Sequence, residues 1–448
     1  MSLHAVHVPT RDELVRATAN KPVPKGIKLV AAVLAVLGAL IFIYGAATGQ
    51  DRAWLALQFN WTYFTIISSA GVAFAAVQRL TTARWSRPIV RFAEGYVAWL
   101  PVAFVIQLLF LFPGAKHIYA WAKAPVHVAE KATYLDPTFF RVRGIVVFGA
   151  IVFFSLWFVL RSIRLDVGIL PEESTASGWA KGMRDGMRRG FRDERRELHS
   201  THSLLGKIAV VVCLLFGFGW SLLIWDYSMT ISLHFQSTMY GWQVFMGAWL
   251  VMLMTMSILL RWWRNHLNAP DLITDSHFHD VGKLCFAFTA FWGYLTFAQY
   301  LVIWYGNLPE ETHYFRLRLM EPWIGMTTAV AIMVFVVPFF GLLGKYPKLF
   351  SPTMITIAVS STLGIWLHRY LEIYPSVFGG VQEGVTSMPF GLFEIGIGLG
   401  MLGLWGVCYT SWMDAFPKMR VFMMTSPYRD EVQVPCDPKT MEPLPAHE

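Results

Sequence analysis

Six ionisable side chains interrupt stretches of sequence that are otherwise apolar. They are Glu94, Asp226, His368, Arg369, Glu372 and Glu394. Such groups are costly in lipid, face protein or water when they occur there, and mark ion pathways by default. A histidine beside carboxylates is also suited to accepting and releasing protons near neutral pH. The set therefore predicts proton movement, with Glu94 near one side of a membrane and the other carboxylates toward the opposite side.

Two interpretations of this set remain open from the residues alone. His368 and Glu372 are four residues apart, which places them on one face of a helix. In a structural interpretation, Asp226 caps a helix end and Arg369 pairs with Glu372, while His368 donates to a backbone carbonyl. In a functional interpretation, the residues belong to two proton half-paths or line a pocket of the size of a quinone.

The cysteine and histidine pattern predicts no metal or haem site in this chain. Cys213, Cys285 and Cys408 lie in apolar stretches, and Cys436 lies near the C-terminus. None has the paired spacing that a zinc or iron–sulfur site requires, and the C-x-x-C-H motif of covalently bound haem is absent. A haem held between helices needs two inward-facing histidines, whereas only His368 lies well inside an apolar stretch.

The composition predicts an all-α integral membrane protein. Hydrophobic residues make up 55% and charged residues 15% of the 448 positions, and the mean hydropathy is +0.46; soluble domains are about one quarter charged. Apolar runs of about 20 residues match a hydrocarbon layer of about 30 Å, in which helices satisfy their own backbone. We expect ten spans, at about 27–48, 54–78, 90–112, 140–162, 205–226, 240–262, 281–304, 322–343, 350–372 and 389–412.

The cations in the short loops predict that both termini are cytoplasmic. The expected cytoplasmic side holds Arg79, Arg84, Arg87, Arg91, Arg261, Arg264, Lys283, Lys345, Lys348, Lys418 and Arg420. The opposite side holds Lys116, Lys123, Lys131, Arg141, Arg143, Arg316 and Arg318. The net charge of +8 follows from this bias and does not indicate nucleic-acid binding, which needs a clustered basic face on a soluble module.

Residues 163–204 form a long connection on the expected cytoplasmic side. Within it, Trp179, Met183, Met187 and Phe191 recur every fourth residue, with arginines on the other faces. This pattern is typical of a helix lying on an anionic membrane surface. A solvated arm that contacts a neighbouring subunit is the alternative.

The segment FAQYLVIWYGNLPEET, residues 297–312, marks the outer end of a span. Trp304 suits the interface between lipid and water, and Pro309 stops the helix. Glu310 and Glu311 then face outward, where we expect them to contact a partner protein.

Two segments carry a resemblance to a known family. They read WDYSMTISLHFQSTMYGWQ, residues 225–243, and SHFHDVGKLCFAFTAFWGYLTFAQYLVIWYGNLPEET, residues 276–312. Together with the ten-helix layout, they resemble the NrfD-like membrane subunits, which are related to the polysulfide reductase anchor. More narrowly, they resemble those of bacterial alternative complex III, a quinol:cytochrome c oxidoreductase. Spans 1 and 2 lack histidine, and the long loop after span 3 resembles that of the second such subunit, the ActF type.

The resemblance implies a fold, a setting and a set of partners. Spans 2–5 and 6–9 form two four-helix bundles with spans 1 and 10 alongside, in a membrane domain at 27–412 between cytoplasmic segments 1–26 and 413–448. The membrane is the bacterial cytoplasmic membrane. The partners are a sister NrfD-like subunit, an iron–sulfur protein, and multi-haem and mono-haem cytochromes c, which hold the redox centres.

For this chain, the resemblance implies a subunit without a redox cofactor of its own. It implies scaffolding of the complex, proton conduction and a contribution to binding quinone or menaquinone, for which His234, Tyr227 and Trp304 are the candidates. A secondary transporter and a purely structural anchor remain alternatives. A transporter would place helix breaks at matching positions in two halves, and Pro101 and Pro338 are candidates for such breaks.

Overall fold

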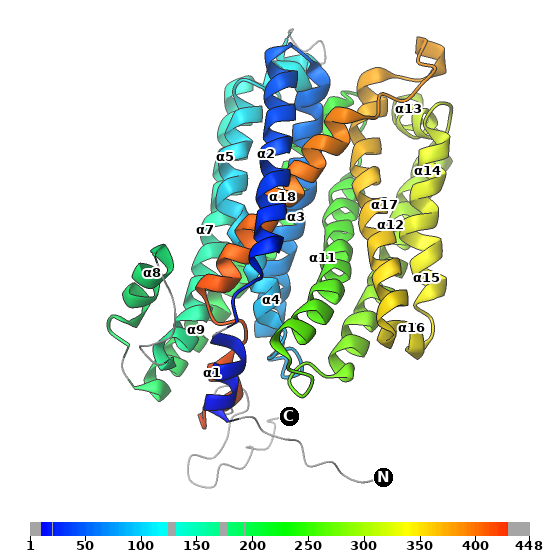
Figure 1. Cartoon of the computed structure of the whole chain (residues 1–448). Coiled ribbons are helices and arrows are strands. Elements are labelled where there is room, and N and C mark those ends of the chain that lie inside the picture. The colour runs from blue at the N-terminus through cyan, green and yellow to red at the C-terminus, as the bar shows by residue number, and fades with distance from the viewer. Residues whose placement is uncertain (1–9, 20, 124–130, 171–177, 192, 429–448) are drawn as a thin grey trace, which may run out of the picture.

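The computed structural model describes residues 10–19, 21–123, 131–170, 178–191 and 193–428 (Figure 1). Over these ranges the chain is helical and contains no strand. The longer elements are α1 Arg11–Ala19, α2 Lys25–Ala47, α3 Asp51–Leu80, α5 Leu100–Leu111, α7 Pro137–Ile169, α8 Trp179–Arg188, α9 Glu194–Leu214, α10 Trp220–Tyr227, α11 Thr238–Leu267, α12 Asp275–Gly306, α13 Pro309–Arg318, α14 Ile324–Ala331, α17 Ser351–Phe378 and α18 Leu392–Ala415. The shorter elements are α4 Val90–Glu94, η1 Gly95–Trp99, α6 Ala115–Ile118, η2 Ala120–Ala122, η4 Leu215–Gly219, η5 Met229–Ile231, η6 Ile332–Val336, α15 Val337–Gly341, α16 Lys345–Leu349, η7 Val381–Glu383 and α19 Val421–Thr425.

Nine helical stretches of the described chain are long and apolar enough to cross a membrane, so the protein is a multi-pass membrane protein. They are Lys25–Ala47, Asp51–Leu80, Val90–Leu111, Pro137–Ile169, Glu194–Ile231, Thr238–Leu267, Asp275–Gly306, Ile324–Gly341 and Leu392–Ala415. The expected span 350–372 falls on α17, which is not among the nine. Its serines, threonines and charged C-terminal half lower its hydropathy, although it runs beside the others (Figure 1).

Helix α3 is the most deeply buried of the nine, because it contacts helices on several sides. It packs against α5, α9, α11, α17 and α18. On one side α7 contacts α5 and α9, and on the other α11 contacts α12 and α17. Helix α14 also packs on α17. The buried polar groups discussed below lie between these helices.

Helices α2 and α18 cross at a point where two glycines meet. A Cβ placed on Gly38 would lie 2.3 Å from the Cα of Gly400. Small residues at a helix crossing let the backbones approach closely, which is a common way to associate helices in lipid. Much of the remaining surface of α2 is exposed, and α2 packs mainly on α18 and also on α3.

We expect Gly38→Ala to destabilise the protein by about 1–3 kcal/mol, the usual cost of overpacking a tight contact. Unfolding of the purified chain by denaturant in detergent measures this free energy. Gly26→Ala is the control on the same helix, because nothing lies within 4 Å of a Cβ at that position. An equal response of the two variants would contradict the proposed role of the crossing.

Three membrane-spanning stretches contain a segment that is not regular α-helix. The segments η4 and η6 are π-helical turns inside the stretches 194–231 and 324–341, and η1 is a 3₁₀ turn inside 90–111. π-Turns often occur at functional sites. The 3₁₀ turn precedes Pro101, and the second π-turn precedes Pro338.

Two short helices, α8 and α19, lie at the end of the molecule where the described part of the chain begins and ends. Helix α8 falls within the expected basic segment 163–204, lies at the side of the bundle (Figure 1) and packs on α7. Its Arg184 is buried and donates to the carbonyl of Ala415 at 2.6 Å. The expected tail 413–448 contributes α19, which packs on α7 and α1. Residues 429–448, with Cys436, lie outside the described part of the chain.

Candidate functional site

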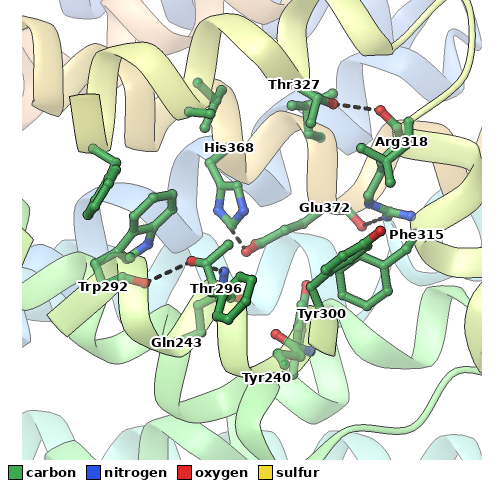
Figure 2. Close-up of a pocket in the computed structure, with 18 of the residues that line it drawn as sticks. Tyr240, Gln243, Trp292, Thr296, Tyr300, Phe315, Arg318, Thr327, His368 and Glu372 are labelled. Carbon is green, nitrogen blue, oxygen red and sulfur yellow. Dashed lines mark hydrogen bonds and ion pairs between the residues drawn. The ribbon is translucent and has the colours of Figure 1, made fainter. Parts of the chain in front are cut away.

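A half-open cavity lies between α11, α12, α13, α14 and α17, and His368 and Glu372 form part of its wall (Figure 2). Its volume is about 500 Å³, within the range of about 300–1,000 Å³ that is usual for small-molecule sites. The lining is mainly aromatic and apolar, with a few polar groups: Tyr240, Gln243, Trp292, Thr296, Tyr300, Tyr314, Phe315, Arg318, Thr327, Phe335, His368, Leu371 and Glu372. This combination is what a membrane-soluble ligand with a polar head requires.

The polar wall of the cavity is centred on Glu372. Its Oε1 lies 3.2 Å from His368 Nδ1, as expected for residues four apart on one helix face. Its Oε2 lies 2.7 Å from Arg369 Nη1, and the Arg318 guanidinium donates to its backbone carbonyl at 2.8 Å. Glu372 is 3% exposed, so these cations hold a buried negative charge in place.

The ring of His368 has two alternative partners on the same nitrogen. Nδ1 lies 3.0 Å from Arg369 Nη2 and 3.2 Å from Glu372 Oε1. A neutral ring with a free Nδ1 lone pair accepts from Arg369, whereas a protonated Nδ1 donates to Glu372. The nitrogen therefore faces side chains instead of a backbone carbonyl, and it can gain or lose a proton with a partner in both states.

Aromatic side chains complete the cavity. Trp292 packs edge-on against His368, with ring centroids 5.6 Å apart, and its indole Nε1 has no hydrogen-bond partner among the described residues. Arg318 lies over the ring of Tyr314, 3.3 Å from its centroid. Burial raises the pKa of Tyr314, so its hydroxyl stays protonated. The wall thus offers flat apolar surfaces and several donors to a bound ring.

A second, larger cavity of about 710 Å³ adjoins the first and shares Gln299 with it. Gln299 donates to Ser237 at 3.0 Å. Beside it, Phe235 stacks on Tyr314 with ring centroids 3.8 Å apart. Glu311 lies at the wall of the larger cavity, and Glu310 is exposed on the first turn of α13.

The remaining predicted carboxylates lie away from this cavity in buried ion pairs. Asp226 accepts from Arg143 at 2.7 and 2.8 Å and from Tyr134 at 2.7 Å. It is therefore part of an ion pair instead of a helix cap. An aspartate held by two bonds from one arginine is suited to joining α10 to α7.

Glu394 is held in a similar way at the N-terminus of α18. It accepts from Arg52 at 2.8 and 3.1 Å and from Tyr374 at 2.9 Å. The N–H of Gly391 donates to it at 2.8 Å. These contacts join α3, α17 and α18, which indicates a structural role.

Glu94 belongs to a charged cluster near the end that carries the described termini. Arg91 lies between Glu94 and Asp166 and is paired with both, and Arg420 also pairs with Glu94. Ser162 donates to Glu94 at 2.9 Å. The six predicted residues thus fall into four separate groups, of which only His368, Arg369 and Glu372 lie together.

The predicted quinone contacts are not brought together by the fold. Tyr227 is fully buried, with its hydroxyl 2.6 Å from Gln107. His234 is exposed in the loop before α11, and Trp304 is 59% exposed on α12. None of the three lines the cavity at Glu372.

The sequence does not show which residues pair in these clusters. Arg52 and Arg143 stand at the ends of expected spans, and Asp166 stands in the expected loop 163–204. Each pairs with a residue at least 75 positions away, so only the packing of the helices reveals the pair. Among the described residues, no group of histidine, cysteine or acidic side chains could hold a metal ion.

Comparisons with known proteins do not identify a family. No family model matches the chain, and no curated protein matches it. The resemblance to NrfD-like subunits therefore stays a prediction based on the two quoted segments.

Proposed function

We propose that the chain is an integral membrane subunit of a quinol:electron-acceptor oxidoreductase of the alternative complex III type. In this proposal it scaffolds the complex and holds a quinone-type ring in the cavity at Glu372. The electron carriers, haem c and iron–sulfur clusters, belong to partner chains. The membrane is the bacterial cytoplasmic membrane, with both termini on the cytoplasmic side.

The observation that carries the proposal is the cavity of about 500 Å³ with the His368–Glu372 pair in its wall. A quinone has a flat ring with carbonyl oxygens and a long apolar tail. Aromatic walls suit the ring, Trp292 and Tyr240 can donate to its oxygens, and His368 can accept a proton from a quinol. The proposed quinone contacts are therefore Trp292, Tyr240 and His368. They differ from the candidates predicted from the sequence, which were Tyr227, His234 and Trp304.

The architecture is the second part of the proposal. We take α17 as the tenth span and divide the helices into two four-helix groups, with α2 and α18 alongside. The contacts of α3 with α5 and α9, and of α11 with α12 and α17, support this division. Arg79, Arg87 and Arg91 at the end that carries the described termini support a cytoplasmic location for that end.

Purification in mild detergent with a cavity-filling variant tests the proposal. We expect the wild-type chain to co-purify with haem absorbance and quinol-dependent electron transfer. Thr296→Trp should raise the KM for quinol or lower turnover by about tenfold or more, because it fills a cavity whose contacts position the ring.

The matched control is Tyr294→Trp, on the same helix but exposed and outside the cavity lining. This variant should leave both the KM for quinol and the turnover unchanged. A chain that purifies without redox partners, or equal effects of the two variants, would refute the proposal.

A secondary transporter is the second candidate, and the interrupted helices favour it. The 3₁₀ turn before Pro101 and the π-turn before Pro338 lie in stretches 90–111 and 324–341, and transporters use such breaks near their binding sites. Solute uptake by the chain alone in vesicles would support transport, and its absence together with co-purified haem would exclude it.

A further inference from the structure

A small polar cavity lies at the end of α3 nearest the chain termini, apart from the site at Glu372. It is bounded by α3, α7 and α9 and by the segment around Arg420, and its volume is about 40 Å³. A buried water needs roughly 10–15 Å³ by this measure. The space is therefore roughly that of three waters, or of one tetrahedral oxyanion.

The cluster around this cavity has more positive than negative charge among the described residues. Arg79, Arg87 and Arg420 line it, and Asp166 is the carboxylate in its wall. Asp166 is already paired with Arg91, which is also paired with Glu94. The guanidinium of Arg79 donates to the backbone carbonyl of His202 at 2.6 Å, so the three arginines of the wall face a single lining carboxylate.

Polar atoms in the wall lack partners among the described residues. The Nε atoms of Arg79 and Arg420 are buried and make no hydrogen bond. Gln78, which is 9% exposed, has an unpartnered side-chain oxygen and carries an amide that can donate after rotation. An unmade hydrogen bond on a buried charged group is costly, so an occupant that accepts hydrogen bonds is favoured.

The cavity lies at the level where an oxyanion is available from the bilayer. Arg79 is in the last turn of α3, a stretch long and apolar enough to span the membrane, which ends at Leu80. Phosphate groups of lipids occupy that interfacial depth, and arginine is the preferred partner of phosphate because its guanidinium matches the geometry of the oxygens.

We propose that this cavity binds a phosphate oxyanion, either the phosphodiester of an anionic lipid head group or free phosphate. The donors are Arg79 and Arg420, with Gln78 beside them. Arg420 also pairs with Glu94, so the oxyanion competes with Glu94 for the same guanidinium. Occupancy of the cavity then alters the charge balance around Glu94. The proposal does not depend on the proposed function.

Binding is measured on the full-length chain, with any co-purifying partners, as the shift of the thermal unfolding midpoint. The probes are inorganic phosphate, short-chain phosphatidylglycerol and, as reference, phosphatidylcholine of the same chain length. We expect a saturable rise of the midpoint with at least one of the first two probes. A response to phosphatidylglycerol alone assigns the site to a lipid head group, and a response to phosphate of equal strength assigns it to the free anion.

Arg79→Gln should weaken the apparent affinity by about tenfold or more, since it removes a charged hydrogen-bond donor. Arg84→Gln is the control: it removes the same charge from the same end of the molecule, but Arg84 is exposed and does not line the cavity. If Arg79→Gln does not fold, Ala83→Phe fills the cavity without changing the charge and should abolish the response.

Two outcomes would overturn the proposal. One is an equal loss of affinity in Arg79→Gln and Arg84→Gln, which would indicate general attraction to a basic surface. The other is the absence of a saturable shift with both phosphate and phosphatidylglycerol in the wild-type chain.

Discussion

Arg91→Met is expected to lower the free energy of unfolding by about 3–5 kcal/mol, the cost of breaking a buried ion pair by removing one partner. Arg91 is 1% exposed and is paired with both Glu94 and Asp166. Its removal leaves Asp166 with only the backbone N–H of Phe422 as a described hydrogen-bond donor, at 2.8 Å. Denaturant unfolding of the purified chain in detergent gives the free energy directly.

Arg264→Met is the control for this prediction. Arg264 pairs at 2.7 Å with Asp275, whose side chain is 70% exposed. An exposed pair contributes about 0–1 kcal/mol, so the loss should be small. The double variant Arg91→Met with Asp166→Asn should recover part of the stability, because it removes the stranded charge. A loss for Arg91→Met no larger than that for Arg264→Met would contradict the prediction.

The second large effect is expected at the cavity. Because the proposed function makes Glu372 the partner of a proton-accepting His368, Glu372→Gln should lower quinol-dependent turnover by about 10²-fold, the lower end of the usual contribution of a general acid or base. The amide keeps the size of the side chain but cannot stabilise a protonated imidazole.

The control for Glu372→Gln is Glu321→Gln, at an exposed position outside the cavity lining. It should leave quinol-dependent turnover unchanged. A variant at Glu372 that retains wild-type turnover would leave the cavity without a role in proton transfer. Thermal unfolding of both variants separates a loss of activity from a loss of folded protein.

The helices could be predicted from the sequence because the bilayer imposes their length. Apolar runs of about 20 residues locate spans such as 27–48, which the structure places at Lys25–Ala47. The residues at which the helices end are less predictable, because helix caps and packing against other helices lengthen them. The expected span 205–226 belongs to a helical stretch that reaches from Glu194 to Ile231 with a π-turn inside it, and no local pattern predicts that turn.

The candidate site could be predicted only where its members are neighbours on one helix. The spacing of His368 and Glu372 predicts their contact, since four residues bring side chains onto one face. Arg318, on another helix, donates to the backbone carbonyl of Glu372. Sequence spacing carries no information about this contact. For the same reason, Glu94 could be singled out as a buried charge, but its pairing with Arg420 could not.

The position of His368 between Arg369 and Glu372 has a kinetic consequence. When Nδ1 gains or loses a proton, its hydrogen bond changes partner between Glu372 and Arg369 while the heavy atoms can stay in place. Such a relay needs no hinge, loop closure or helix rotation, and it can work inside a tightly packed helix. Under the proposed function, we expect the rate of proton transfer to depend on how fast protons are delivered to the ring, not on motion of the backbone.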